Sequence, residues 1–269
     1  MKIFDTHAHY DDDRFDEDRE YLLDERGLLK EVSYEEIDKV SCIDKITNIG
    51  FDIESSENSV GYANKYDFMY AAIGVIPHHV ADMKEEDIES LRRLVDSSDK
   101  VVAIGEIGLD YYYDEPDRDL QKKWFVRQMD FAREVGLPIV IHSREAAKDT
   151  YDLMCDCHAE EIGGVVHCYS YTEEMAREFM KLGFFFGIGG TLTFKNSKKL
   201  RKAVAAIPIE NIVLETDSPY LTPSPNRGKR NDSRYLPYVV AEIARLKDMS
   251  MEDVARITYQ NACKLYRIK

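Results

Sequence analysis

The stretch KIFDTHAHYDD, residues 2–12, joins a short apolar run to two histidines one residue apart and then to two aspartates. Neutral imidazoles buried in a core need hydrogen-bond partners, so two of them together are costly unless something binds them. Other short apolar runs along the chain also end in polar residues. The arrangement of these runs therefore decides both the fold and the meaning of the histidine pair.

Eight short apolar runs predict eight strands. They cover residues 2–5, 45–50, 68–74, 101–106, 138–141, 164–167, 184–187 and 212–215. Several are continuously apolar, as expected for parallel strands that are covered on both faces. The segments between them show helical spacing, as in Phe125, Met129 and Ala132 before Gly136. Strands that alternate with helices in a chain of 269 residues predict one domain over residues 1–269, a closed (β/α)8 TIM barrel of the α/β class.

An open, doubly wound sheet is the alternative fold. Such a sheet normally carries a glycine-rich phosphate loop after its first strand, and none follows Phe4. Residues 27–44 lengthen the first connection between strands, and we interpret them as an extra helix or a rim loop without an assigned role. Thr172 and Ser250 are predicted to cap the helices that follow them.

The composition limits the classes of function. The formal net charge is −15, which argues against a protein that wraps a long nucleic acid through many phosphate contacts. A small anionic substrate, or one strand end fed into a pocket, is compatible with this charge if metal ions supply positive charge locally. No apolar run is long enough to cross a bilayer and no signal peptide is recognised, which predicts a cytoplasmic protein without membrane association or an evident obligate protein partner. The five cysteines, an odd number, argue against a disulfide framework.

Polar side chains stand at the predicted carboxyl ends of the strands, which form the active face of such a barrel. They are His7 and His9 after the first strand, Glu106 after the fourth, His142 and Arg144 after the fifth, His167 after the sixth, and Glu215 and Asp217 after the eighth. His7 and His9 are two residues apart on a strand and therefore point to the same side. Four imidazoles and two carboxylates around one cavity would be unstable alone, because like charges repel and dry imidazoles lack partners. The pattern therefore predicts a site for two divalent cations.

These motifs resemble those of the TatD family of metal-dependent deoxyribonucleases, within the amidohydrolase superfamily. The resemblance rests on His7-x-His9, GEIGLD (105–110), IHSRE (141–145), HCYS (167–170), ETDSPYLTP (215–223) and NACKLY (261–266), and it runs from about residue 1 to 266. It implies a TIM barrel with a two-metal site. By position, the resemblance assigns His7, His9 and Asp217 to one ion and His142 and His167 to the second, with Glu106 as the bridge.

The implied chemistry is hydrolysis of a phosphodiester. The metal pair would activate a water, Asp217 would accept its proton as general base, and Glu106 would hold both ions. Arg144 could hold the phosphate through two hydrogen bonds, or instead pair with Glu145 or a neighbouring acid. One of the tyrosines at 111–113 could stack on an unpaired base, although packing at the rim is the alternative. Ligation by histidines and carboxylates leaves Mg²⁺, Mn²⁺ and Zn²⁺ open.

Two segments depart from the family's pattern. The family often has a His-Pro pair after its third strand, whereas this chain has Ile76-Pro77 and then His78, which is still available to contact substrate. The loop that usually reads RGKRNEP reads RGKRNDS here, residues 227–233, so its acid is shortened and Ser233 replaces its proline. The loop is rich in cations, and Arg227 is a candidate contact for the substrate backbone at the mouth, with a solvated surface loop as the alternative.

Three functions remain open from the sequence. The leading hypothesis is a metal-dependent phosphodiesterase, an exodeoxyribonuclease that cleaves DNA ends, with single-stranded DNA or strand ends as substrate. The alternative is an ester or amide hydrolase with the same binuclear site, for example an aminoacyl-tRNA deacylase, because a fold does not choose between chemistries. The third is a non-enzymatic role for a structural metal, which the position of the predicted ligands at the mouth disfavours, since structural sites are usually closed.

Overall fold

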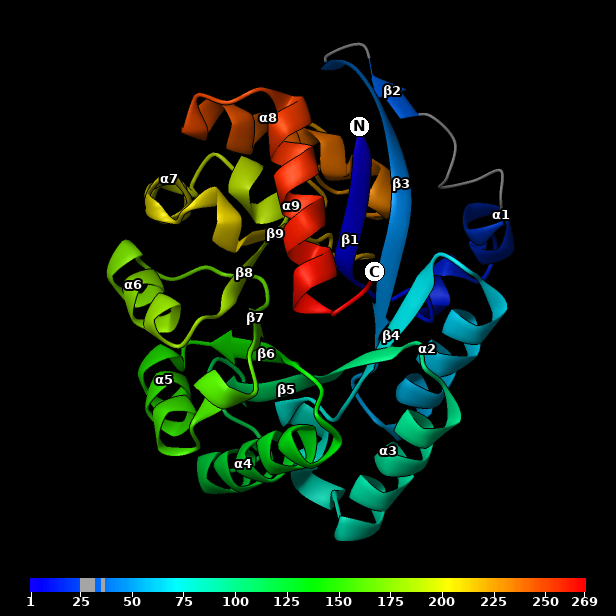
Figure 1. Cartoon of the computed structure of the whole chain (residues 1–269), viewed down its shortest axis with the longest axis vertical. Helices are drawn as coiled ribbons and strands as arrows, with labels where there is room; N and C mark the ends of the chain where they lie inside the picture. The colour runs from blue at the N-terminus through cyan, green and yellow to red at the C-terminus, as the bar shows by residue number, and fades with distance from the viewer. Residues whose placement is uncertain (25–31, 35–36) are drawn as a thin grey trace.

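Eight parallel strands form a nearly closed barrel that is surrounded by helices (Figure 1). The structure is a computed structural model, and it describes residues 1–24, 32–34 and 37–269. The strands are β1 (Lys2–Ala8), β2 (Val32–Tyr34), β3 (Ile37–Ile49), β4 (Met69–Ile73), β5 (Val101–Asp110), β6 (Ile139–Arg144), β7 (Gly164–Val166), β8 (Phe185–Ile188) and β9 (Ile212–Leu214). The α-helices are α1 (Arg19–Leu23), α2 (Ile53–Lys65), α3 (Glu85–Ser97), α4 (Arg118–Val135), α5 (Ala147–Asp156), α6 (Glu173–Lys181), α7 (Lys198–Ala206), α8 (Leu236–Lys247) and α9 (Met251–Leu265).

The barrel closes between its first and last strands. The strands pair in the order β1, β3, β4, β5, β6, β7, β8 and β9, and each neighbouring pair is parallel. Just past β9, Ser218 forms a parallel bridge with Ala8, and the backbone N–H of His9 donates to the Ser218 carbonyl at 2.8 Å. The predicted (β/α)8 TIM barrel is therefore confirmed. The open doubly wound sheet is wrong, because its two edge strands would remain apart.

The prediction for residues 27–44 is wrong where the structure describes them. Residues 32–34 form β2, which pairs antiparallel with β3, and β3 begins at Ile37 rather than at Lys45. Among its residues, the β-branched Val32, Ile37 and Val40 and the aromatic Tyr34 favour strand. The extra segment therefore extends a barrel strand into a two-stranded ribbon, instead of adding a helix or rim loop. Residues 27–31 and 35–36 lie outside the described residues.

An apolar layer fills the barrel interior. It takes side chains from each barrel strand: Phe4, Ile49, Ala72, Val102, Ala103, Val140, Val165, Phe185 and Val213. The end of α9 packs against this layer through Leu265 and Tyr266, and the Tyr266 hydroxyl donates to the Thr6 carbonyl at 2.7 Å. The polar residues of the strand ends gather beyond this layer, toward the carboxyl ends of the strands.

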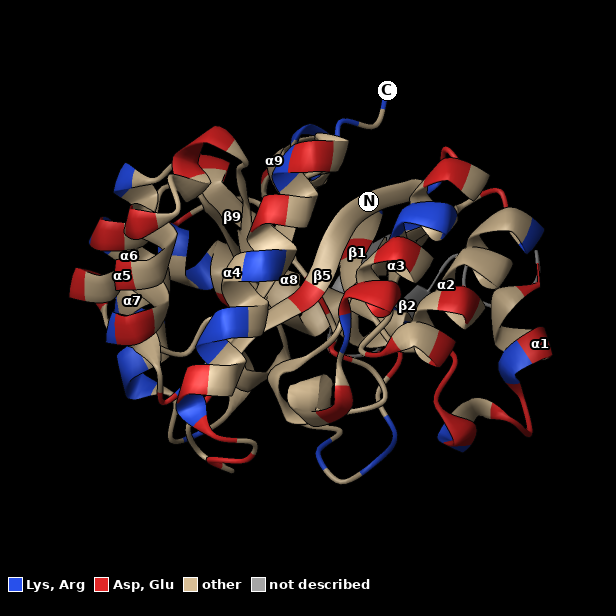
Figure 2. Cartoon of the chain, turned by 90° about the horizontal axis from the view of Figure 1, so that it is seen from below, with Lys and Arg blue, Asp and Glu red and all other residues tan. Residues whose placement is uncertain are grey.

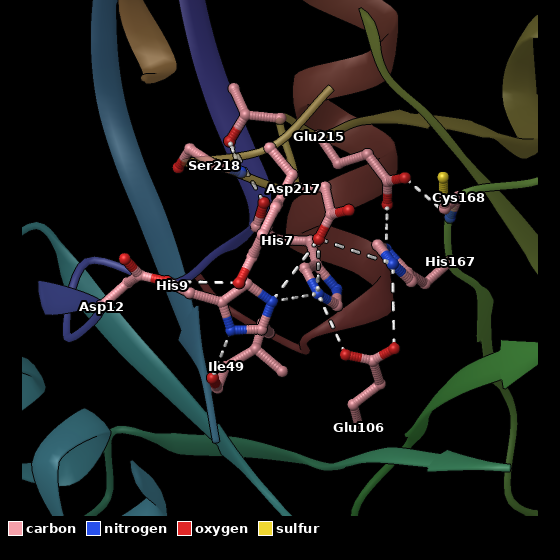
Figure 3. Close-up of polar contacts among 12 residues, drawn as sticks. His7, His9, Asp12, Ile49, Glu106, His167, Cys168, Glu215, Asp217 and Ser218 are labelled. Atoms are coloured by element: carbon pink, nitrogen blue, oxygen red, sulfur yellow. Dashed lines mark hydrogen bonds and ion pairs between the residues drawn. The ribbon is translucent and has the colours of Figure 1, made fainter. Parts of the chain in front are cut away.

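Irregular strand pairing helps to place two of these polar residues. The register of β1 against β3 shifts within residues 5–8, and the register of β5 against β6 shifts within residues 104–107. Such irregularities break the strict alternation of side chains and re-aim individual residues. His7 and Glu106 lie inside these two segments. Both side chains are buried, and they face each other across the barrel (Figure 3).

The predicted helix ends are confirmed at three places. Thr172 accepts a hydrogen bond from the backbone N–H of Met175 at the start of α6, and Ser250 accepts one from Asp253 at the start of α9. Gly136 ends α4 with a φ of 71°, a left-handed conformation that glycine adopts without strain. Local sequence signals therefore fix these boundaries.

The helices around the barrel carry acidic side chains interleaved with basic ones (Figure 2). Several form ion pairs along one helix, such as Arg177 with Glu173 and Lys181 with Glu178. Because the net charge is −15, the outer surface as a whole offers little attraction to a long polyanion. Within the described ranges, every helix is too short or too polar to cross a membrane.

Candidate metal centre

The structure brings all six predicted metal ligands into one cluster at the carboxyl ends of the strands (Figure 3 shows most of them). They are His7 on β1, His9 just after it, Glu106 on β5, His142 on β6, His167 just after β7, and Asp217 after β9. Residues from five strands meet here because the carboxyl ends of parallel barrel strands surround one opening. The predicted convergence is therefore present, while the role of these residues as ligands stays a prediction.

The first set of potential ligands consists of His7, His9 and Asp217. The Nε2 atoms of the two histidines lie 3.2 Å apart. Asp217 Oδ1 lies 3.5 Å from His9 Nε2 and 3.8 Å from His7 Nε2. One nitrogen of each ring and one carboxylate oxygen thus face a common point, and all three lie within 4.8 Å of one another. This is a donor set for a first-row divalent ion.

The second set consists of Glu106, His142 and His167. Glu106 Oε1 lies 2.6 Å from His142 Nδ1 and 3.8 Å from His167 Nε2. The other carboxylate oxygen, Oε2, lies 3.5 Å from His7 Nε2 and so faces the first set. Glu106 therefore stands between the two sets with one oxygen toward each, which is the arrangement that a bridging carboxylate requires.

Three of the four imidazoles form a hydrogen bond through the ring nitrogen that points away from the cluster. His9 Nδ1 bonds to the carbonyl of Ile49 at 2.9 Å, His142 Nε2 to Asp110 Oδ2 at 2.9 Å, and His167 Nδ1 to Glu215 Oε2 at 3.0 Å. In each ring the other nitrogen faces the cluster. Histidines that bind metals usually donate their second N–H to a carboxylate or a carbonyl in this way, which fixes the tautomer. The residues present therefore fit a metal centre.

His7 is arranged differently. Its ring stacks on His167 with 3.5 Å between centroids and 15° between planes. Its Nε2 faces the cluster, whereas its buried Nδ1 has no hydrogen-bond partner among the described residues. A buried nitrogen without a partner is costly, so His7 lacks the supporting hydrogen bond that fixes the other three rings.

The carboxylates at the cluster favour positive charge. Burial alone would lower the pKa of His9, but its contact with Asp217 and the charge of Glu106 raise it to about 9. Burial also opposes protonation of His167, yet Glu215 and Glu106 raise its pKa to about 10. His7 behaves oppositely, because burial and the neighbouring His167 lower its pKa. The site thus attracts cations strongly while one of its nitrogens stays free of a proton.

Glu106 and Asp217 remain ionised. Burial would raise the pKa of each, but the imidazoles around them outweigh burial: His167 and His142 hold the pKa of Glu106 well below its usual value, and His9 and His167 hold that of Asp217 below its own. Both carboxylates are therefore available as anionic ligands. Asp217 is also partly exposed and lines the cavity, so a water in the cavity can reach it.

The cluster forms the floor of an open cavity of about 590 Å³. Lining residues include His9, Glu106, His142, His167 and Asp217, whereas His7 lies beneath them. Such a volume suits a small ligand or the end of a chain rather than a duplex. We call these five residues and His7 the floor of the cavity.

His78 and Arg144, two of the three predicted substrate contacts, line the wall of this cavity. His78 Nε2 lies 3.1 Å from Asp110 Oδ2. The guanidinium of Arg144 lies over the ring of Tyr112, 3.8 Å from its centroid. The alternative of an ion pair between Arg144 and Glu145 or another acid is absent from the described part of the chain, where Arg144 has no carboxylate within ion-pair distance.

The third, Arg227, lies elsewhere. It is exposed, its guanidinium covers Phe194 at 3.9 Å, and it is not one of the residues that line the cavity. The neighbouring cation Arg230 pairs with Asp18 at 2.7 Å. Arg227 and Arg230 therefore attach the basic loop at 227–234 to other segments of the chain, and the geometry gives no support to a substrate contact by Arg227.

Ser233, which replaces the family's usual proline, has a structural role. Its hydroxyl donates to Asp5 at 2.6 Å, and its backbone N–H donates to the Tyr10 hydroxyl at 3.1 Å. Proline could supply neither donor. This departure therefore ties the loop to the strand that carries His7 and His9.

Sequence reasoning missed three residues around the cluster. Asp110 closes the GEIGLD motif and supports His142, but it received no role. Glu215 was recognised at a strand end without its function of holding His167. Cys168 Sγ lies within 4.8 Å of donor atoms of His167 and Asp217, so a thiol is close to the site. Their positions in the quoted motifs were the available signal.

A (β/α)8 barrel with histidines and carboxylates gathered at the carboxyl ends of its strands defines the class of TIM-barrel metal-dependent hydrolases. The family model described as TatD related DNase matches residues 4–267. The chain therefore belongs to the TatD family and is a metal-dependent hydrolase, as the sequence motifs predict.

Individual relatives agree with this assignment. The chain is 42% identical over 266 residues to the uncharacterized metal-dependent hydrolase YabD of Bacillus subtilis (strain 168), covering 99% of each chain. It is 31% identical over 272 residues to the uncharacterized metal-dependent hydrolase YcfH of Escherichia coli (strain K12), covering 100% of this chain and 97% of YcfH. The crystal structure of YjjV, a TatD homolog from Escherichia coli K12, superposes with a TM-score of 0.88 at 27% identity, covering 99% of this chain and 98% of YjjV.

Proposed function

We propose that this chain is a metal-dependent phosphodiesterase that removes nucleotides from DNA ends, with single-stranded DNA or strand ends as substrate. The observation that carries the proposal is Glu106, which turns one carboxylate oxygen toward each of two adjacent ligand sets at the floor of an open cavity. Paired cations beneath an open cavity are typical of enzymes that hydrolyse phosphate esters. The family description, TatD related DNase, points to the same substrate.

Two divalent ions, Mg²⁺, Mn²⁺ or Zn²⁺, are the proposed cofactors. One would be held by His7, His9 and Asp217, the other by His142 and His167, with Glu106 between them. When bound, such ions lower the pKa of water and take up charge from phosphate oxygens. The carbonyl of Ile49 and the carboxylates of Asp110 and Glu215 keep the rings turned toward these positions.

The chain's own residues account for the remaining requirements. Asp217 is ionised and partly exposed at the floor, so it is the proposed general base that accepts a proton from the attacking water. Arg144 stands on the wall without a carboxylate partner in the described part of the chain, and its guanidinium can donate two hydrogen bonds to a phosphate. His78 lies on the same wall. Together they place a phosphate above the floor.

The substrate follows from size and charge. A cavity of about 590 Å³ admits a few nucleotides and excludes a duplex from the floor. The net charge of −15 disfavours contacts along a lengthy backbone. A single-stranded end that enters the cavity meets the metals and Arg144 without burying many phosphates against acidic helices.

The test uses purified protein with Mn²⁺ or Mg²⁺ and single-stranded DNA labelled at the 5′ or the 3′ end. We expect stepwise shortening from one end, lost on treatment with EDTA and in Asp217→Asn, and retained in the surface control Asp67→Asn, which alters an exposed acid. Bis-p-nitrophenyl phosphate and a panel of esters, amides and aminoacyl-tRNA are tested in parallel. Turnover of acyl substrates alone would replace the proposal by the ester or amide hydrolase.

A further inference from the structure

We propose that Tyr113, His78 and Arg144 form a subsite that binds an unpaired nucleobase beside the metal centre. This inference rests on the proposed action on nucleic-acid ends and names the part of the substrate that this wall of the cavity recognises. The phosphate next to that base would lie over the floor.

Tyr113 is an exposed aromatic residue on a cavity wall. It is 60% exposed, yet it lines the cavity. A large apolar ring left in water at a binding site is a stacking platform, because every base has a face that can cover it. Tyr220 also lines the cavity and is exposed, but Arg14 covers its ring at 4.0 Å and Asp12 lies 3.3 Å from its hydroxyl. Arg144 lies over the Tyr113 ring only at 5.2 Å, so Tyr113, the more exposed of the two rings, is the better platform.

His78 and Arg144 lie next to the Tyr113 ring and form the other two sides of the subsite. The ring of His78 meets Tyr113 edge-on, with 5.0 Å between centroids and 84° between planes. The guanidinium of Arg144 lies 5.2 Å from the Tyr113 centroid. A stacked base would thus meet a polar ring edge on one side and a cation on another. Arg144 is the only lysine or arginine among the described residues that line the cavity, so it also marks the place of the adjacent phosphate.

Asp110 joins this platform to the metal centre. Its Oδ1 accepts the backbone N–H groups of Tyr112 and Tyr113 at 2.9 and 3.1 Å, which fixes the turn after β5. Its Oδ2 contacts His142 Nε2 at 2.9 Å and His78 Nε2 at 3.1 Å. One buried carboxylate therefore positions a predicted metal ligand and the backbone that carries Tyr113, and it lies beside His78. A base bound here would be held at a fixed position relative to the residues of the floor.

The outer side of the same turn is also anchored. The Tyr111 hydroxyl donates to Asp149 at 2.7 Å, and Arg118 covers the Tyr111 ring at 4.0 Å. The Tyr111 ring is thereby covered by its neighbours, whereas Tyr113 stays 60% exposed although Arg144 lies over its ring at the longer distance of 5.2 Å. Because the backbone of the turn is held from both sides, little ordering is required when a base binds.

The test measures binding without turnover. A short single strand of deoxyadenylate with phosphorothioate linkages, labelled at one end, is titrated with the Mn²⁺-loaded protein. A second strand carries abasic tetrahydrofuran residues at the unlabelled end, and both label positions are used. Tyr113→Ala should weaken binding of the base-bearing strand by about 5- to 100-fold and that of the abasic strand by less than about 2-fold. Tyr113→Phe, which keeps the ring, should bind within about 2-fold of wild type.

Controls separate this subsite from general effects. Tyr21→Ala removes an equally exposed ring on α1, outside the cavity, and should bind both strands as wild type does. Arg144→Ala should weaken both strands, because it removes a phosphate contact. Melting temperatures close to that of wild type exclude misfolding.

The inference is overturned if Tyr113→Ala weakens both strands equally or neither, or if wild type fails to distinguish or bind them. Hydrolysis of the unmodified strand is measured separately. Base-dependent binding without hydrolysis would support the subsite and reject the phosphodiesterase. Hydrolysis with no effect of Tyr113→Ala would do the reverse.

Discussion

The charged side chains on the floor of the cavity and those on its rim have different kinds of partner. On the floor, each carboxylate faces more than one imidazole, and three of the four rings are hydrogen-bonded on their far side so that the other nitrogen points into the cluster. On the rim, which comprises the cavity wall and the neighbouring loop at 227–234, cations lie against aromatic rings or pair with acids: Arg144 on the wall lies on Tyr112, and Arg230 in the loop pairs with Asp18. The floor gathers carboxylate oxygens and imidazole nitrogens that can serve as ligands for cations, whereas Arg230 on the rim is already paired with Asp18. Hydrolysis should therefore depend on the residues of the floor. Substrate binding should depend on the few rim residues that substrate can reach, such as Arg144.

The largest effect is expected from Glu106→Ala. This change removes the carboxylate that faces both ligand sets, so bound metal should fall and kcat/KM should drop by at least about 10³-fold, since the loss of one stabilising donor alone typically costs roughly 10²–10³. Elemental analysis and the DNA-end assay measure the two losses. The fold should persist, because Glu106 lies outside the apolar core layer.

Glu106→Gln is the matched control for shape. It keeps the side-chain volume and removes the charge, so it should lose metal as Glu106→Ala does, while both variants unfold cooperatively near the temperature of the metal-free wild type. Full turnover in Glu106→Ala would show that the bridging position is wrong and that the floor does not work as one unit.

A smaller effect is expected from Asp110→Asn, which changes the support behind the floor. Asparagine keeps an oxygen for the backbone N–H groups of Tyr112 and Tyr113 but no longer offers a charged partner to His142. Replacing such an outer partner typically lowers metal affinity by about 10- to 100-fold. Metal titration by calorimetry checks this. Unchanged metal affinity would mean that Asp110 stabilises only the turn that carries Tyr112 and Tyr113. Its contact with His142 would then not matter for metal binding.

Arg144→Ala tests the open part of the rim. The floor is untouched, so kcat should stay near wild type while KM for single-stranded DNA rises by at least about 10-fold, the expected loss of the charge-assisted contact between Arg144 and a phosphate. The slope of log KM against log salt should also decrease by about 0.7, because one phosphate contact is lost. A fall in kcat with an unchanged KM would instead place Arg144 among the catalytic groups and remove the distinction between floor and rim.

The sequence predicted the floor well for a physical reason. Polar residues at the ends of apolar runs must meet if the runs are parallel strands of one barrel, so His7, His142 and Asp217 could be assigned to one cluster without knowing any side-chain angle. The same logic located all eight barrel strands. The β2–β3 ribbon was missed because the apolar spacing of residues 27–44 alone did not distinguish strand from helix or loop.

The rim could not be predicted in the same way. Whether a cation is open or neutralised depends on its partners in space, and Arg230 and Asp18 are separated by 212 residues in the chain. The loop at 227–234 appeared as a basic cluster for the same reason. Asp110 shows a related limit: a buried acid at a strand end signals importance, but its contacts with both His142 and the Tyr113 turn are visible only in three dimensions.

The smallest effect is expected from Arg227→Ala. This variant tests whether Arg144 on the cavity wall contacts the substrate while Arg227, outside the cavity lining, does not. Arg227 was an equal candidate with Arg144 from the sequence, yet it covers Phe194 outside the cavity lining. KM and its salt dependence should change by less than about 2-fold, and stability by no more than about 1 kcal/mol, the worth of an exposed cation–π contact. The assay is the one used for Arg144→Ala, with the double variant as a check that the two effects add. If Arg227→Ala raises KM as much as Arg144→Ala does, the strand must cross the β9 side of the mouth, and the open wall at Tyr113 is not its main path.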